Sequence, residues 1–337
     1  MATRCNEVGE LQQLWTLPDP ELQRNPCHLS HGLIYAAVAG IVYGLCTVTV
    51  KLAETNDSST AQIVFTQNVL CVLAMIPFIL HQQLPIVNYP KRDKGLLILN
   101  GVIEAIGRIS LYYAFRYGLV GNVSSITFGT LPIITACIAR IFLGEKWNFV
   151  DAVNTILNVA GIVLITGPSF MLGNSSDESG HDSTNNLAIS TVLSIVTAVL
   201  LAISAVAIRS LRTDVHITVI LFYVGAIGSV VIFPGLLISN VDSWHGNLYA
   251  WVYTCVQAIC YILASLAVMS ALHMEQAPTV ILLVNIQICV AYIGDVTIFS
   301  ENVKFWEIIG AALILGSSAI VAVYKWWNNR KNCSEVS

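Results

Sequence analysis

The residues best suited to chemistry are four polar side chains that recur at every fourth position, namely Asn100, Glu104, Arg108 and Tyr112. On an α-helix this spacing places them on one face, in a polar stripe about 18 Å long. The residues around them are mostly apolar, and a charged side chain at the centre of a membrane-spanning helix costs about 2.5–3.5 kcal/mol. Glu104 and Arg108 are therefore expected to face a protein interior rather than lipid.

Two interpretations of Glu104 and Arg108 follow from their chemistry and spacing. In the first, both line a water-filled cavity, where the planar guanidinium of Arg108 suits a carboxylate or phosphate group and Glu104 is the candidate for proton coupling. In the second, they form an internal ion pair that locks the helix in place, since a glutamate four residues before an arginine has the right spacing. We favour the cavity. The two interpretations overlap, because a paired arginine can still be released to an anion.

Three more residues join the polar stripe as candidates for contacting a solute: Gln67, Gln257 and Asn285. Each lies inside an apolar segment, where an amide side chain serves equally well as an interhelical hydrogen bond. Asp295 lies one turn from the end of its segment. We expect Asp295 to be an interfacial charge rather than a proton-titrating group.

The composition shows what kind of protein must position these residues. Of 337 residues, 55% are hydrophobic and only 11% are charged, whereas about a quarter of the residues are charged in soluble globular chains. The mean hydropathy is +0.72. The formal net charge of −4 offers no basic surface for nucleic acid. These values exclude a soluble enzyme, a nucleic-acid binder and a disordered chain, and they indicate an all-α polytopic membrane protein.

Ten apolar segments have the length of a transmembrane helix, which takes about 20 residues. They are predicted at 31–52, 60–80, 95–115, 119–138, 148–167, 187–209, 215–238, 249–272, 276–299 and 305–327. With the N-terminus in the cytosol, twelve lysines and arginines lie inside and three outside. This asymmetry follows the positive-inside rule and predicts that both termini are cytosolic.

Four glycosylation sequons occur, at Asn56, Asn122, Asn174 and Asn332. The charge asymmetry puts the first three on the outside, and Asn332 in the cytosolic tail. Asn174, in the serine-rich loop 169–186, is the best predicted acceptor, and Asn56 is the second. Asn122 lies too close to the membrane to be a good one.

The chain also contains an internal repeat. Three pairs of landmarks recur at offsets of 158, 157 and 156 residues: Lys51 and Arg209, Pro77 and Pro234, and Glu145 and Glu301. Each half then holds five spans, and because five is odd, the second half enters the membrane inverted. Inverted repeats are typical of secondary transporters, whose solute site lies near the midplane between the halves.

The predicted organisation has five parts: a cytosolic tail (1–30), a first five-helix repeat (31–167), a non-cytosolic linker loop (168–186), a second five-helix repeat (187–327) and a second cytosolic tail (328–337).

A family resemblance rests on five runs of residues within one continuous stretch. They are Leu111-Tyr112-Tyr113-Ala114-Phe115, Ile126-Thr127-Phe128, Leu131-Pro132, Phe142-Leu143-Gly144-Glu145 and Gly161-Ile162-Val163-Leu164-Ile165. The stretch resembles the drug/metabolite transporter superfamily in its EamA-type branch, and within it looks closest to solute carrier family 35, subgroup G. The resemblance covers about 31–327. It implies two EamA-like five-helix repeats around a central cavity, with small organic solutes as cargo.

We therefore predict a secondary transporter that moves a small organic solute by alternating access, with an organic anion or metabolite favoured because of Arg108. The alternative is a membrane adaptor or regulatory protein that retains the transporter fold without transporting. An enzyme is not expected, because the sequence has no HExxH, P-loop or histidine-rich box. For the same reason we expect no cofactor and no metal. The predicted partners are the solute and the lipid bilayer, with a homodimer left open. The membrane is predicted to be the plasma membrane or an endomembrane of the endoplasmic reticulum or Golgi.

Overall fold

The computed structural model describes most of the apolar part of the chain. The residues that it describes are 26–86, 88–143, 153, 156–157, 159–165, 180–209, 211, 215–238, 248–274, 280, 283–301 and 303–334. The predicted acceptor Asn174 and the landmark Glu145 lie outside these residues, as do most of the predicted linker and much of the predicted span 148–167.

The described part of the chain consists of helices joined by turns and irregular connections, and it contains no strand. The helices whose two ends both lie in described residues are α2 (Pro26–Thr55), α3 (Thr60–His81), α4 (Lys91–Tyr117), α5 (Val120–Leu143), α7 (Gly180–Arg209), α8 (Ile217–Ile238), α9 (Leu248–Met274), α11 (Ile286–Thr297) and α12 (Phe305–Ser334). Six of these are long and apolar enough to cross a membrane: α2, α3, α4, α7, α8 and α9. These helices confirm the prediction of an all-α polytopic membrane protein.

Several helix ends differ from the predicted spans. Helix α7 begins at Gly180, inside the predicted linker loop, and α12 continues to Ser334, inside the predicted C-terminal tail. Helix α2 begins at Pro26, although its apolar stretch begins at Gly32. The predicted spans follow the apolar runs of the sequence. A helix ends where its backbone hydrogen bonds end, and these can continue beyond an apolar run into polar residues.

The span predicted at 276–299 is also different, because it is not one regular helix. A turn at Asn285 precedes α11, and the Ile288 N–H donates to the Asn285 carbonyl over only three residues. Such i→i+3 bonds are common where an α-helix starts.

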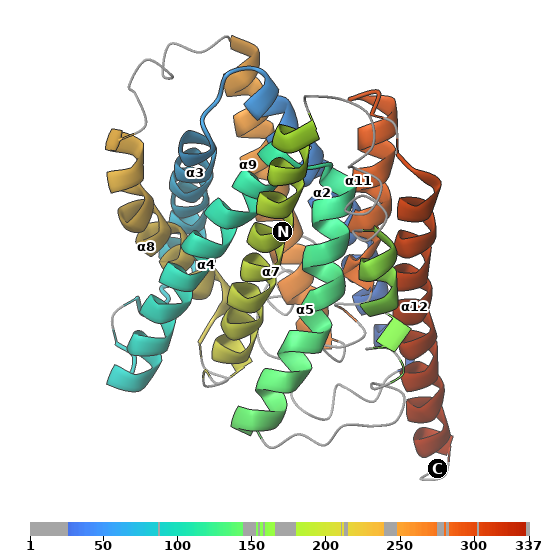
Figure 1. Ribbon diagram of the computed structural model, residues 1–337. Coiled ribbons are helices and arrows are strands. Elements are labelled where there is room, and N and C mark those ends of the chain that lie inside the picture. Colours follow the sequence, from blue (N-terminus) through green and yellow to red (C-terminus); the bar gives the residue numbers. More distant parts are fainter. Residues whose placement is uncertain are drawn as a thin grey trace, which may run out of the picture.

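The helices pack as a bundle in which segments far apart in sequence lie side by side (Figure 1). Helix α2 packs against α9 and α11, α4 packs against α7 and α8, α3 packs against α8, and α5 packs against α7. The approach of α2 to α11 and to the residues just before it is close: a Cβ added at Gly40 would lie 2.9 Å from the Val284 carbonyl oxygen, and one at Gly44 would lie 3.1 Å from the Gln287 carbonyl oxygen of α11. Long-range packing of this kind joins described helices of the first half of the chain to described helices of the second half.

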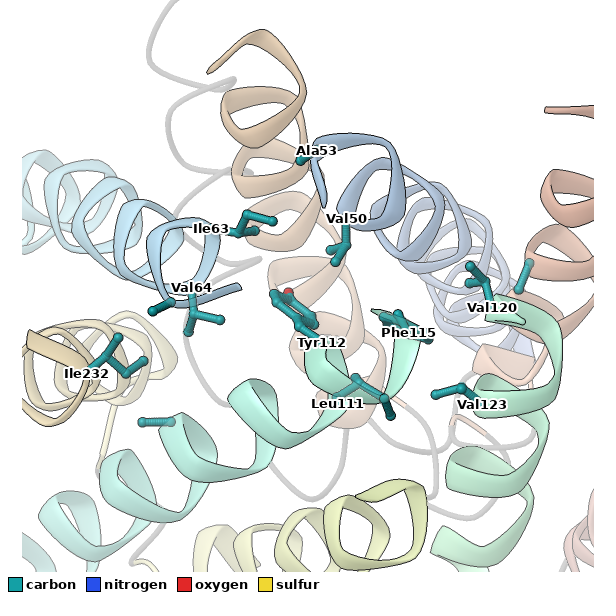
Figure 2. Close-up of a cluster of buried hydrophobic side chains, with 14 of the residues drawn as sticks. Val50, Ala53, Ile63, Val64, Leu111, Tyr112, Phe115, Val120, Val123 and Ile232 are labelled. Atoms are coloured by element: carbon teal, nitrogen blue, oxygen red, sulfur yellow. The ribbon is translucent and has the colours of Figure 1, made fainter. Parts of the chain in front are cut away.

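One end of the bundle is filled by apolar side chains. It is the end at which α2 and α4 finish and α3 and α5 begin, and we call it the Lys51 end. Figure 2 shows these buried side chains converging from α2, α3, α4, α5 and α8. The apolar plug comprises Val50, Ile63, Val64, Tyr112, Phe115, Val120, Val123, Ile232 and Ala291. The opposite end, at which α4 and α8 begin, has a separate cluster containing Leu97 and Ile220.

Candidate functional site

The polar stripe of α4 faces the interior of the bundle. Asn100 is fully buried, Arg108 retains 4% of its surface and Tyr112 retains 3%. The Glu104 side chain is the most accessible of the four, with 18% exposed. Glu104 and Arg108 therefore contact protein, while apolar residues of α4 such as Leu99 and Ile106 lie exposed on its surface.

Glu104 and Arg108 form a loose pair within α4. The Arg108 Nε lies 3.7 Å from Glu104 Oε2, which is too long for a hydrogen bond, and donates instead to the Glu104 backbone carbonyl at 3.3 Å. The Glu104 Oε1 accepts a hydrogen bond of 2.7 Å from the Ser204 hydroxyl of α7. That hydroxyl is also 2.8 Å from Asn100 Oδ1, and because it has one proton it serves one acceptor at a time.

The guanidinium of Arg108 has unused donors. Its Nη1 and Nη2 are both buried and have no hydrogen-bond partner. Its central carbon lies 4.8 Å from the centroid of the Tyr261 ring, and this cation–π contact stabilises the charge without using any N–H group. Tyr261 is in turn met edge-on by Tyr43, whose hydroxyl is 2.9 Å from Ser265 Oγ. An arginine with four free N–H hydrogens in a buried position can bind a planar anion through two parallel bonds.

Tyr112 belongs to a second network that links three helices. Its hydroxyl donates to Gln67 Oε1 of α3 at 2.6 Å and accepts from Gln257 Nε2 of α9 at 2.7 Å. Gln257 Nε2 also lies 2.6 Å from Gln67 Oε1 and 3.5 Å from the Cys46 sulfur. The amide nitrogen of Gln67 is buried with no partner. Both glutamines thus make interhelical hydrogen bonds, and one unmet donor remains beside them.

Six of the seven predicted residues therefore share contacts in two groups that meet on α4: Asn100, Glu104 and Arg108 form one with Ser204, and Gln67, Tyr112 and Gln257 form the other. Asn285 lies elsewhere: it is buried at the start of α11, a helix that packs on α2 and α5. Their role in binding a solute stays a prediction.

Sequence reasoning missed Ser204, Tyr43 and Ser265. Serine and tyrosine are frequent in transmembrane helices, so these residues carried no signal of their own. Only the packing of α7, α2 and α9 brings them to the polar stripe.

The expectation that Asp295 is an interfacial charge is wrong. Its side chain is fully buried, with Oδ1 accepting the Val120 N–H at 3.2 Å and Oδ2 accepting the Gly121 N–H at 2.6 Å. The first N–H groups of a helix have no partner within it, and they attract a carboxylate. The N-terminus of α5 therefore draws Asp295 into the interior.

The asparagine side chains of two sequons, Asn122 and Asn56, form hydrogen bonds within the protein. Asn122 is buried, with its amide donating to Glu307 Oε1 and its carbonyl accepting from the Tyr292 hydroxyl. Asn56 donates to the Leu52 carbonyl at 2.8 Å. Asn174 is still the predicted acceptor.

Comparisons with known proteins agree with this architecture. Residues 30–167 match the model of the EamA-like transporter family. The chain is 26% identical over 322 residues to human "Solute carrier family 35 member G1", covering 93% of this chain and 84% of that protein. It is 23% identical to the "Pseudopaline exporter CntI" of Pseudomonas aeruginosa, covering 88% of this chain and 94% of that protein.

A protein of known crystal structure has a similar fold, with a TM-score of 0.57 over 86% of this chain and 96% of that one. The two are 12% identical, so the likeness concerns the fold alone. The matched residues, the relatives and the multi-pass helical fold together support the drug/metabolite transporter superfamily in its EamA-type branch: residues 30–167 match the EamA-like transporter family, and most of the chain is similar to solute carrier family 35, subgroup G.

Proposed function

We propose that the protein is a secondary transporter that carries a small organic anion across the membrane by alternating access. The observation that carries this proposal is the pair of buried, unpartnered Nη atoms of Arg108. A buried donor without a partner costs about 1–3 kcal/mol, and more for a charged group. A carboxylate or phosphate group that binds there recovers this energy, so the site favours an anion over a neutral solute.

The proposed solute site lies around Arg108, Glu104 and Tyr112. Three features support a solute that is small and only partly polar. Arg108 supplies the charge, the unmet amide donor of Gln67 supplies a second polar contact, and the rings of Tyr261 and Tyr43 supply aromatic surface beside Arg108. Pockets that bind small molecules commonly combine an apolar wall with a few placed polar groups.

The helix pairing supports two inverted repeats, 31–167 and 187–327, joined by the linker 168–186, with ten spans in all. If the halves correspond, α2 matches α7 and α4 matches α9, so the α2–α9 contact has its counterpart in α7–α4. The α11–α2 contact then has its counterpart in α5–α7. Both α3 and α8 also contain a proline inside the helix, at Pro77 and Pro234. A pseudo-twofold axis of this kind allows one half to rock against the other.

Glu104 is proposed to couple transport to a proton. It competes with an incoming anion for Arg108, because both are negative and Arg108 is the shared partner. A proton on Glu104 removes that competition and leaves Arg108 to the solute. Anion binding therefore strengthens as pH falls on the loading side, and the proton travels with the anion.

Glu104→Gln tests this coupling. Glutamine keeps the Ser204 contact but mimics the protonated carboxyl at every pH, so transport should lose its pH dependence. We expect the wild-type protein to transport faster at low pH on the loading side, and the variant to show a flat profile. Asn100→Ala, which removes the other acceptor of the Ser204 hydroxyl without removing a charge, is the control and should keep the wild-type slope. A variant profile that still follows the wild-type curve would make Glu104 a structural residue.

The proposed function itself is tested by uptake into proteoliposomes. The purified chain is reconstituted, and a panel of radiolabelled mono-, di- and tricarboxylates and sugar phosphates is offered with and without an inward proton gradient. We expect saturable uptake of at least one anion, and none of neutral sugars of the same size. The absence of uptake for every anion, from protein that is folded and inserted, would favour the adaptor instead. The site and its solute do not depend on which membrane the protein occupies, and the proposed location remains the plasma membrane or an endomembrane, with both termini cytosolic.

A further inference from the structure

A cluster of charges lies at the Lys51 end, outside the site described above. The Lys51 Nζ is 3.7 Å from Asp295 Oδ1 and 3.7 Å from Glu301 Oε1. It also lies 4.8 Å from the centroid of the Phe299 ring. Only 13% of the Lys51 side chain is exposed, compared with 45% of Glu301. Helix α2 is thus tied to the end of α11 and to the segment that follows it.

Asp295 extends this cluster to a third helix. Besides Lys51, its carboxylate holds the N–H groups of Val120 and Gly121, the first two residues of α5. The Glu301 N–H donates back to the Asp295 carbonyl at 3.0 Å, which keeps the two acidic residues together. One buried carboxylate of the second half of the chain therefore binds two helices of the first half, α2 and α5.

The cluster lies directly beside the apolar plug. Val50 precedes Lys51 in the chain, Val120 supplies one of the N–H groups held by Asp295, and Ala291 lies one turn before Asp295 on α11. All three belong to the plug, as does Tyr112, whose hydroxyl belongs to the solute site (Figure 2). The Lys51 end is therefore closed in two layers, an apolar one and a charged one.

We propose that Lys51, Asp295 and Glu301 form a latch that holds the Lys51 end closed and that must open before the solute site can reach this side of the membrane. This inference rests on the alternating-access mechanism proposed above, but not on the identity of the solute. Separating α2 and α5 from α11 removes Lys51 and two helix N–H groups from Asp295 at once. A buried charge left without partners is strongly unfavourable until water reaches it. The latch thus favours the closed state, and its strength sets how often this face opens.

The experiment measures how fast a buried cysteine at each end of the bundle reacts with a bulky, charged thiol reagent in the purified full-length protein. Val123→Cys reports on the plug and Val219→Cys on the opposite end; both valines are fully buried. Mass spectrometry assigns the modification to each site, so the native cysteines remain in place. No solute is needed, and a failed transport assay leaves this measurement valid.

Lys51→Met removes both ion pairs at once. We expect it to raise the labelling rate at residue 123 by about tenfold, because breaking a largely buried pair changes the opening equilibrium by well over a factor of ten in many proteins. Glu301→Gln should raise it by about twofold, because pairs with an exposed partner contribute little. Lys51→Arg keeps the charge and should label like the wild type, as should Lys304→Met, which removes an exposed lysine near the same end.

The labelling at residue 219 distinguishes the latch from a general loss of structure. The proposal requires that Lys51→Met leave the rate at residue 219 unchanged. Equal increases at residues 123 and 219 would mean that the variant merely loosens the fold, and the latch would be rejected. An unchanged rate at residue 123 would reject it as well. Asp295→Asn, which loses the charge but keeps one acceptor, should give an increase between those of Glu301→Gln and Lys51→Met, and no increase there would contradict the role given to Asp295.

Discussion

Arg108→Lys should lower transport by about 10- to 100-fold while the protein still folds and inserts normally. Lysine keeps the positive charge, so Glu104 and Tyr261 still face a cation, but it lacks the planar fork that binds a carboxylate through two parallel bonds. Losing one strong hydrogen bond to an anion corresponds to about 1.5–3 kcal/mol, which gives the stated range. Initial rates of uptake, normalised to the amount of inserted protein, measure the loss.

A pair of glutamine variants separates a solute site from a structural ion pair. Arg108→Gln alone leaves the partly buried Glu104 beside no cation, and we expect less folded protein as well as no transport. The double variant with Glu104→Gln should recover folded protein, because neither charge is then unpaired, but it should not recover transport. Recovery of transport in the double variant would show that Arg108 does not bind the solute.

Gly44→Val should reduce the folded fraction severely. A Cβ at Gly44 of α2 would overlap the side chain of Val290 on α11. One turn further along α11 the two helices are equally close, because a Cβ at Gly294 would overlap the side chain of Val48 on α2. Overpacking of a well-packed interface costs about 1–3 kcal/mol and sometimes more. The temperature of half-unfolding in detergent, followed by tryptophan fluorescence, should fall by several degrees relative to the wild type.

Gly95→Val is the matched control for this substitution. It makes the same chemical change in a helix, but a Cβ at Gly95 meets no atom within 4 Å. We expect its unfolding temperature to stay near that of the wild type. Equal losses for the two variants would indicate that helix propensity, rather than the contact between α2 and α11, is responsible.

The polar stripe illustrates what the sequence could predict. A spacing of four residues places Asn100, Glu104, Arg108 and Tyr112 on one helix face whatever surrounds that helix, because helix geometry is local. The partners of the stripe could not be predicted in the same way. Ser204 is 100 residues from Glu104 in the chain, and only the packing of α7 against α4 brings the two together.

Asp295 shows the opposite case, in which local position was misleading. One turn from a helix end is usually the membrane interface, and a lone carboxylate there needs no partner. The feature that buries it is the N-terminus of α5, which precedes it by 175 residues. Nothing in the sequence near Asp295 indicates that contact, and the same holds for Lys51.

Tyr112 is the only residue named above that belongs to both the solute site and the closed end. Its hydroxyl is held by Gln67 and Gln257, while its ring stacks on Phe115 within the plug, with the centroids 6.3 Å apart. A tyrosine side chain is rigid beyond its two torsions, so a solute that displaces the hydroxyl also displaces the ring. Solute binding then changes the free energy of opening at the Lys51 end. By linkage, opening at that end changes the binding free energy of the solute by the same amount. A solute that binds the closed state more tightly than the open state would slow its own release towards this face. A solute that binds both states equally would leave the ratio of open to closed protein the same as in the protein without solute.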